Sequence, residues 1–230
     1  MKRILPMVVA ALVGVGGYFL FVHEPSNAVQ HSAATTTQTA NIVADDANED
    51  ADLDTSSITE MMIGNPDAAV TVIEYASFTC PHCASFHAGS FKALKKDYID
   101  TGKINFIYRD VYFDRYGLWA SMVARCSGSP EKFFGMADVI YANQSTWTRA
   151  GEPANIIAEL RKIGLVAGLD NETLEGCLND DEHAKTLVAL YQENATRDDI
   201  SSTPSFLING KKYSNMSFAE MSEIIDAAIE

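Results

Sequence analysis

The order of apolar and polar side chains predicts a buried strand followed directly by a helix. The run 69–75 alternates and is rich in β-branched and aromatic residues, which is typical of a buried strand. Beyond it, one face of a helix is indicated by the spacing of Cys83, Phe86, His87, Phe91 and Leu94. Cys80 and Cys83 therefore lie where a strand ends and a helix begins.

The remaining pattern predicts an α/β domain interrupted by a helical block. A second strand is indicated at 103–111, helical spacing dominates from about 115 to 197, and strand character returns at 205–209. Asn209-Gly210 is a strong signal for a two-residue hairpin turn, and a closing helix is expected from about 217. The expected order is strand, helix, strand, helical block, hairpin and helix.

Residues 1–28 have the layout of an export signal. Lys2 and Arg3 precede an uncharged, mostly apolar run at 4–22. The small residues at 26–28 offer a cleavage site, but the apolar run is also long enough to span a bilayer. We therefore expect either a cleaved signal, which leaves a soluble protein, or an N-terminal membrane anchor that tethers the protein to the inner membrane. In both cases the rest of the chain faces the periplasm, an oxidising extracytoplasmic compartment.

Residues 29–57 are polar, small and acidic, so they cannot bury enough apolar surface to offset the entropy of ordering. We expect a disordered acidic linker there, followed by one folded domain at 58–230. The whole chain carries a formal net charge of −14. This balance argues against nucleic acid as a partner, because phosphate binding needs clustered basic residues.

The motif Cys80-Pro81-His82-Cys83 has the chemistry of a redox pair. Cys80 is expected at the N-cap or first position of the helix, where unpaired N–H groups and the helix dipole favour a thiolate. Pro81 suits the first turn, and His82 would stabilise the thiolate further by protonation or hydrogen bonding. Cys83 is expected to be the less exposed, resolving thiol. A low Cys80 pKa stabilises the dithiol and makes the disulfide a stronger oxidant.

A zinc site is the alternative use of this cysteine pair. Structural zinc takes four protein ligands, and the chain has no second Cys-x-x-Cys motif. His87 could serve as a third ligand, but a fourth would still be needed. We therefore predict neither a metal nor a cofactor.

Thr203-Pro204 directly precedes the strand at 205–209. Proline is disfavoured within a sheet unless it has a special role such as a cis peptide bond, with an ordinary trans proline at a strand start as the alternative. With Glu74–Cys83 and Thr203–Gly210, the chain resembles the DsbA-like thiol–disulfide oxidoreductases of the thioredoxin superfamily. The resemblance implies a thioredoxin fold, a central mixed sheet flanked by helices, with an inserted helical block. The Pro-His dipeptide is typical of disulfide-donating members.

The resemblance also implies roles for individual residues. Cys80 would be the nucleophile, Cys83 its partner in a redox-active disulfide, and Pro204 the cis-proline beside them. The backbone of Thr203 would pair with bound substrate. Glu74 would shuttle protons to Cys83, although a purely structural role for this acid stays open. The expected substrates are unfolded or reduced exported proteins, and a membrane partner would re-oxidise the enzyme.

Two residues depart from the pattern of pure disulfide donors. Ser202 stands where relatives often have glycine, and Thr203 also occurs in isomerase-type and reductase-type relatives. Disulfide isomerase or reductase activity therefore remains an alternative. A redox-inactive binding or chaperone module is the alternative from another class, and the intact Cys-Pro-His-Cys motif argues against it.

Cys126 and Cys177 lie in the helical block, far from the active pair in sequence. The even cysteine count and the oxidising compartment favour a second, structural disulfide between them over two buried thiols.

Overall fold

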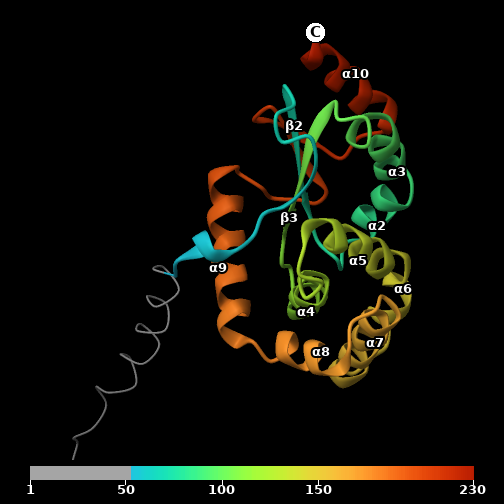
Figure 1. Cartoon of the computed structure of the whole chain (residues 1–230), viewed down its shortest axis with the longest axis vertical. Coiled ribbons are helices and arrows are strands. Elements are labelled where there is room, and N and C mark those ends of the chain that lie inside the picture. The colour runs from blue at the N-terminus through green and yellow to red at the C-terminus, as the bar shows by residue number, and fades with distance from the viewer. Residues whose placement is uncertain (1–52) are drawn as a thin grey trace, which may run out of the picture. The chain divides into compact units, whose positions relative to one another are not determined.

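A five-stranded mixed sheet forms the centre of the computed structural model, which describes residues 53–230 (Figure 1). The strands are β1 Met61–Gly64, β2 Val70–Ala76, β3 Ile104–Asp110, β4 Ser205–Ile208 and β5 Lys211–Ser214. They lie in the order β1-β3-β2-β4-β5, with β2 and β3 parallel and the other neighbours antiparallel. The predicted export segment at 1–28 and the linker up to residue 52 lie outside the described residues.

Strand β2 is the central strand and leads directly to the cysteine motif. It pairs with β3 from Val70 opposite Ile104, and its other edge pairs with β4. Its side chains alternate between the two faces of the sheet, so Glu74 and Tyr75 are buried on opposite sides. Both faces are covered, and this explains why the strand is apolar along nearly its whole length.

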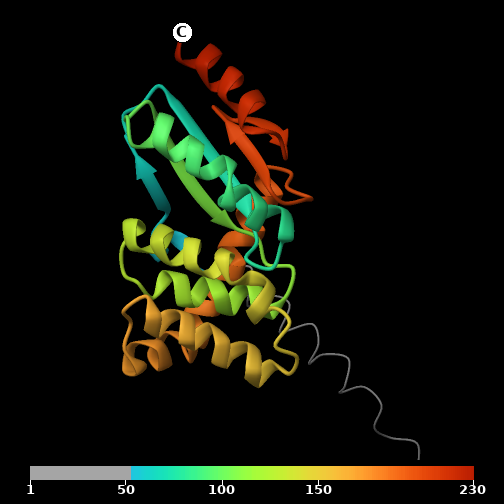
Figure 2. The same cartoon turned by 90° about the vertical axis from the view of Figure 1, so that its right-hand side faces the viewer.

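Helices cover both faces of the sheet and one end of it. Their bounds are α2 Pro81–Ala88, α3 Ser90–Leu94, α4 Arg115–Arg125, α5 Pro130–Ala142, α6 Gln144–Trp147, α7 Pro153–Val166, α8 Asn171–Leu178, α9 Asp181–Arg197 and α10 Phe218–Ile229. Helices α2, α3 and α10 lie on one side of the sheet and α9 on the other, while α4–α8 form a block at one end (Figures 1 and 2). Between residues 53 and 230, none of the helices is both long and apolar enough to cross a membrane.

The hairpin predicted at Asn209-Gly210 joins β4 to β5. Asn209 and Gly210 have φ angles of 47° and 80°. A two-residue type I′ turn requires positive φ at both positions, which Asn and Gly adopt most readily. The Asn209 side chain also accepts a hydrogen bond from the Thr71 N–H at 2.9 Å, which ties the turn to β2.

Local structure departs from the sequence prediction at three places. Gly89 has a non-helical backbone and divides the predicted first helix into α2 and α3, which a π-helical turn, η3 Lys95–Ile99, then follows. The short edge strand β1 is not predicted, because it has only four residues and no long alternation. The 3-10 helix η2 Thr55–Ser57 falls in the stretch expected to be a disordered linker. Thr55 Oγ1 donates to Glu193 of α9 at 3.0 Å, so this helical turn contacts the domain predicted at 58–230.

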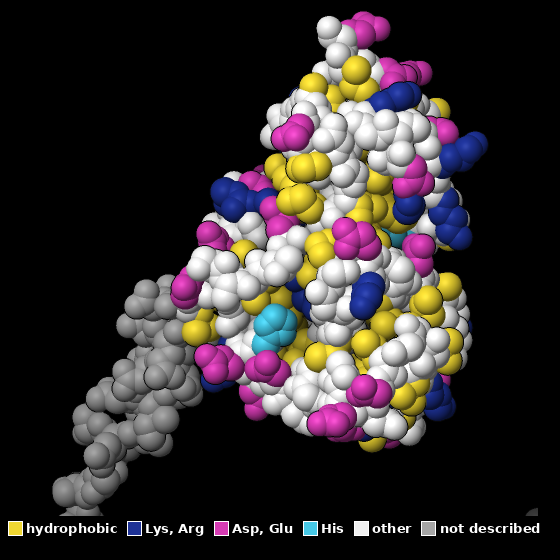
Figure 3. All heavy atoms as spheres, viewed as in Figure 1, with side chains coloured by type: hydrophobic (Ala, Val, Ile, Leu, Met, Phe, Trp, Pro, Cys, Tyr) yellow, Lys and Arg dark blue, Asp and Glu magenta, His cyan; other side chains and the backbone are white. Residues whose placement is uncertain are grey.

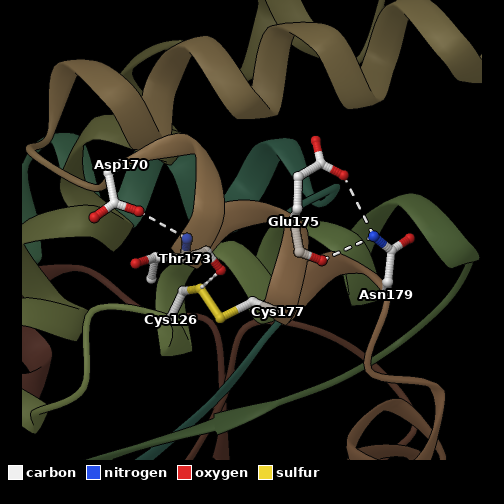
Figure 4. Close-up of a disulfide and its surroundings, with 6 residues drawn as sticks. All are labelled: Cys126, Asp170, Thr173, Glu175, Cys177 and Asn179. Carbon is white, nitrogen blue, oxygen red and sulfur yellow. Dashed lines mark hydrogen bonds between the residues drawn. A yellow bond between two sulfur atoms is a disulfide. The ribbon is translucent and has the colours of Figure 1, made fainter.

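A disulfide joins Cys126 and Cys177 inside the helical block (Figure 4). Cys126 is the C-cap of α4 and Cys177 lies in α8, with their Cα atoms 5.9 Å apart. Asp170 caps α8 beside the bridge by accepting the Thr173 N–H at 2.7 Å. The bridge therefore fixes the end of one block helix to the body of another.

Replacement of both cysteines by alanine is expected to destabilise the protein without abolishing its chemistry. The bridge spans a sequence separation of 51, and closing a loop of that size contributes on the order of 4 kcal/mol in the chain-entropy model. Urea unfolding of Cys126→Ala/Cys177→Ala measures the loss. An unfolding free energy equal to that of the native chain would contradict this expectation.

Candidate active site

Cys80 is the N-cap residue of α2, and Pro81 occupies the first turn. The Cys80 backbone is extended, with φ −81° and ψ 119°, so its side chain lies at the start of the helix, where backbone N–H groups lack helical partners. The backbone N–H groups of His82 and Cys83 lower the pKa of the Cys80 thiol. His82 thus affects this thiol through its backbone, while the residue is exposed to solvent.

The loop before β4 approaches the same sulfur from the other side. The Thr203–Pro204 peptide bond is cis. The Cys80 thiol donates to the Thr203 backbone carbonyl at 3.4 Å. The Thr203 hydroxyl is buried and has no hydrogen-bond partner within residues 53–230, and its proximity helps to lower the pKa of Cys80. Pro204 is buried beside this contact.

Hydrogen bonds hold the pKa of Cys80 well below that of an ordinary thiol, at about 5. The hydrogen bond from the Cys83 thiol is the largest cause, and the Thr203 hydroxyl and the two backbone N–H groups add to it, while burial opposes them. The pKa of Cys83 shifts in the opposite direction. Burial raises its pKa, and the hydrogen bond to Cys80 and the charge of Glu74 raise it further. At neutral pH the pair is therefore one thiolate and one thiol.

Glu74 lies in the interior behind Cys83. Its side chain is fully buried, and one carboxylate oxygen, Oε2, lies 2.9 Å from His87 Nε2 of α2 in a shared hydrogen bond. Within residues 53–230, the other oxygen, Oε1, and His87 Nδ1 have no hydrogen-bond partner. The His87 ring also stacks on Tyr141, with ring centroids 4.4 Å apart. His87 is thus a partner of Glu74 rather than a ligand grouped with the cysteines.

Two side chains from the helical block hold the loop that ends at Cys80. Asp114, the N-cap of α4, accepts a hydrogen bond from Thr79 Oγ1 at 3.1 Å. Gln144 of α6 donates to the backbone carbonyls of Phe78 and Cys80. The nucleophilic loop is therefore fixed to the inserted block as well as to the sheet.

Sequence reasoning singled out the two cysteines, Glu74, Thr203 and Pro204, and the structure brings all five together. It missed the pairing of Glu74 with His87 and the contacts of Gln144. A signal existed for His87, because an ionisable residue on the buried helix face needs a polar partner. None existed for Gln144, which lies on a helix of four residues, 64 positions from Cys80.

The arginines that line a cavity beside β3 are paired with carboxylates. A cavity of about 180 Å³ between β3 and α9 is lined by Arg109 and Arg125, among others. Arg109 bonds to Glu60 and Asp198, and Arg125 bonds to Asp110 at 2.7 Å. On the face shown in Figure 3, basic and acidic side chains of the described residues are interspersed. The arginines of this cavity are thus occupied by carboxylates of the protein itself.

Comparison with known proteins places this dithiol site in a family. The sequence model of the family described as Thioredoxin matches residues 56–227. A provisionally named protein-disulfide oxidoreductase of Rickettsia bellii is 36% identical over 171 residues, which are 74% of this chain and 65% of the relative. Disulfide bond formation protein D of Bacillus subtilis is 27% identical over 168 residues, covering 71% and 72% of the two chains.

Among solved structures, alpha-DsbA1 of Wolbachia pipientis superposes with a TM-score of 0.68 and 27% identity, over 74% of this chain and 91% of that one. The chain belongs to the thioredoxin family. The predicted resemblance to DsbA-like thiol–disulfide oxidoreductases, and the predicted thioredoxin fold with a helical insertion, are confirmed. The chain spans 65% of the length of the Rickettsia relative.

The low pKa of Cys80 makes the stability of the reduced protein depend on pH. A group whose pKa is depressed by folding stabilises the native state above its unfolded pKa, and this contribution is lost as the pH falls through the folded value. We expect the unfolding free energy of the reduced form to fall, relative to the oxidised form, as the pH drops from neutrality to about 5. The oxidised form is the control, because a disulfide does not titrate. Parallel pH profiles of the two forms would show that the Cys80 pKa is not lowered.

Proposed function

We propose that the protein oxidises cysteine pairs of exported proteins by donating the Cys80–Cys83 disulfide to them. The observation that supports this proposal is that the pKa values of the two thiols shift in opposite directions. The pKa of Cys80 is lowered to about 5 and that of Cys83 is raised. A stable Cys80 thiolate is a good leaving group and favours the reduced enzyme over the disulfide. Both effects drive the disulfide from the enzyme towards the substrate.

The reaction begins with attack of a substrate thiolate on Cys80, which is 9% exposed, whereas Cys83 is wholly buried. The bond between the two enzyme sulfurs breaks, and Cys83 leaves with the electron pair and takes up a proton. A second substrate thiolate then attacks the substrate sulfur of the mixed disulfide and expels Cys80 as a thiolate. Two electrons have passed from the substrate dithiol to the enzyme, and one of the two substrate protons remains on Cys83.

Glu74 is the group we assign to proton transfer at Cys83. Cys83 must lose its proton when the enzyme is re-oxidised, and its raised pKa makes this step unfavourable without a base. The negative charge of Glu74 acts on Cys83, and Glu74 Oε1 has no hydrogen-bond partner among the residues that the structure describes. Its bond to His87 holds the carboxylate in place through the other oxygen.

We further propose that residues 1–28 export the protein and that the domain works in the periplasm. The charged start and apolar run at 4–22 support export. The Cys126–Cys177 disulfide is consistent with an oxidising compartment, since such bonds persist there and are rare in the cytosol. For turnover, a membrane oxidoreductase would accept the two electrons from the reduced pair.

Oxidised enzyme mixed with a reduced, unfolded test protein tests the proposal. We expect stoichiometric formation of substrate disulfides and loss of this activity in Cys80→Ser. With an oxidised peptide, Cys83→Ser should accumulate a mixed disulfide through Cys80, because the resolving thiol is absent. Non-reducing electrophoresis and mass spectrometry measure both products.

Three results would contradict parts of the proposal. Oxidation that survives in Cys80→Ser would show that another group carries the chemistry. Rearrangement of a scrambled substrate by the reduced enzyme, without donation by the oxidised one, would favour an isomerase or reductase. No exchange in either direction would indicate a redox-inactive binding module.

Replacing Glu74 by glutamine should slow re-oxidation of the dithiol, because glutamine keeps the shape but cannot accept the Cys83 proton. Loss of a general base costs roughly a hundredfold in rate at the lower end of measured effects. Stopped-flow oxidation by a small disulfide measures the change, with exposed Glu223→Gln as the matched control. An unchanged rate in Glu74→Gln would indicate that this acid is structural.

A further inference from the structure

Gln144 connects the inserted helical block to the backbone around the nucleophile. It is the first residue of α6, and its side chain is buried. The amide nitrogen Nε2 donates to the Phe78 carbonyl at 2.8 Å and to the Cys80 carbonyl at 2.9 Å. The two hydrogens of the Gln144 amide therefore bond to the backbone carbonyls of Phe78 and Cys80, the residues on either side of Thr79.

These two carbonyls belong to the peptide units that set the position of the Cys80 sulfur. The extended Cys80 backbone places this residue at the start of α2, where the backbone N–H groups of His82 and Cys83 favour its thiolate. The Cys80 carbonyl also accepts the Ala84 N–H at 3.2 Å, and the Cys80 N–H donates to Ser77 at 3.0 Å. Rotation of the peptide unit after Cys80 would break the Gln144 bond and turn the helix N–H groups away from the sulfur.

The short helix that carries Gln144 is fixed within the block. Trp147, on the same helix, is fully buried and donates from Nε1 to the Ile140 carbonyl at 3.0 Å. The backbone carbonyl of Gln144 accepts from Thr148 Oγ1 at 2.6 Å. The buried Gln144 side chain therefore reaches the loop from a fixed backbone and can impose a conformation on it, which a mobile surface side chain could not do.

We propose that Gln144 is a positioning residue through which the helical block sets the stability of the Cys80 thiolate. The proposal rests on the proposed role of Cys80 as the nucleophile. Without the two amide donors, the buried Phe78 carbonyl loses the protein partner that Gln144 supplies, and the turn relaxes towards other partners. The sulfur then moves out of line with the helix N–H groups, so the thiolate is less stable and the enzyme disulfide is a weaker oxidant.

The variant Gln144→Met tests this, because methionine has a similar size but no donor. We expect the ultraviolet thiolate absorbance of Cys80 to titrate at a higher pH than in the native chain. We also expect the equilibrium of disulfide donation to glutathione to fall about tenfold, the scale of one lost hydrogen bond to a buried group. Gln192→Met is the matched control, since Gln192 is an exposed glutamine of α9.

A second control separates positioning from stability. Ile156→Val loosens the packing of α7 at a site that is 2% exposed, so it should lower the unfolding free energy without moving the thiolate titration. If Gln144→Met does not fold, Gln144→Ala is measured instead, because alanine removes both donors without adding a charge; the same upward shift is expected.

Two results would overturn the proposal. One is a thiolate titration and a glutathione equilibrium in the folded Gln144 variant that match the native chain. The other is an equal shift in Ile156→Val, which would make the effect one of general stability. Neither would disturb the Cys80→Ser result, so failure of this inference is distinguishable from failure of the proposed function.

Discussion

The stabilisation of negative charge on one sulfur atom, that of Cys80, is the interaction on which the rest of the site depends. A thiolate in a largely buried position loses water, and it persists only where fixed donors replace that water. Here the donors come from the Cys83 thiol, the Thr203 hydroxyl and the N–H groups at the start of α2. The central strand β2 delivers the cysteine to the helix start, the cis-proline loop closes over it, and the helical block fixes the intervening turn. The fold thus brings three separate parts of the chain to one atom.

The raised pKa of Cys83 follows from its buried position in α2. Cys83 is one turn further along α2, where burial and the charge of Glu74 keep its proton in place. Because Cys80 and Cys83 lie three residues apart in opposite environments, Cys80 serves as the leaving group and Cys83 carries the proton. The Glu74–His87 pair lies on the same covered face of the sheet, so the proton path we propose needs no opening of the fold.

Much of this arrangement could be predicted from the sequence, and the parts that could not be predicted have physical reasons. The strand ending at Tyr75, the helix beginning after Cys80 and the Asn209-Gly210 hairpin are local patterns, and local rules were enough to predict them. The edge strand β1 is too short for periodicity to indicate, and Gly89 breaks a helix whose apolar spacing continues unchanged. Gln144 could not be found, because its contacts depend on how the block packs against the sheet. The 3-10 helix at 55–57 was not predicted either, because it lies in a polar segment and contacts the domain through one hydrogen bond, that of Thr55 with Glu193.

The equilibrium redox potential of the Cys80–Cys83 pair, measured against glutathione, reports directly on the stability of the Cys80 thiolate. A stabilised Cys80 thiolate makes the reduced form the favoured one. We therefore predict a potential far more oxidising than the roughly −270 mV of thioredoxin. A potential close to the thioredoxin value would contradict this prediction, because the donors around Cys80 would then not favour the dithiol over the disulfide.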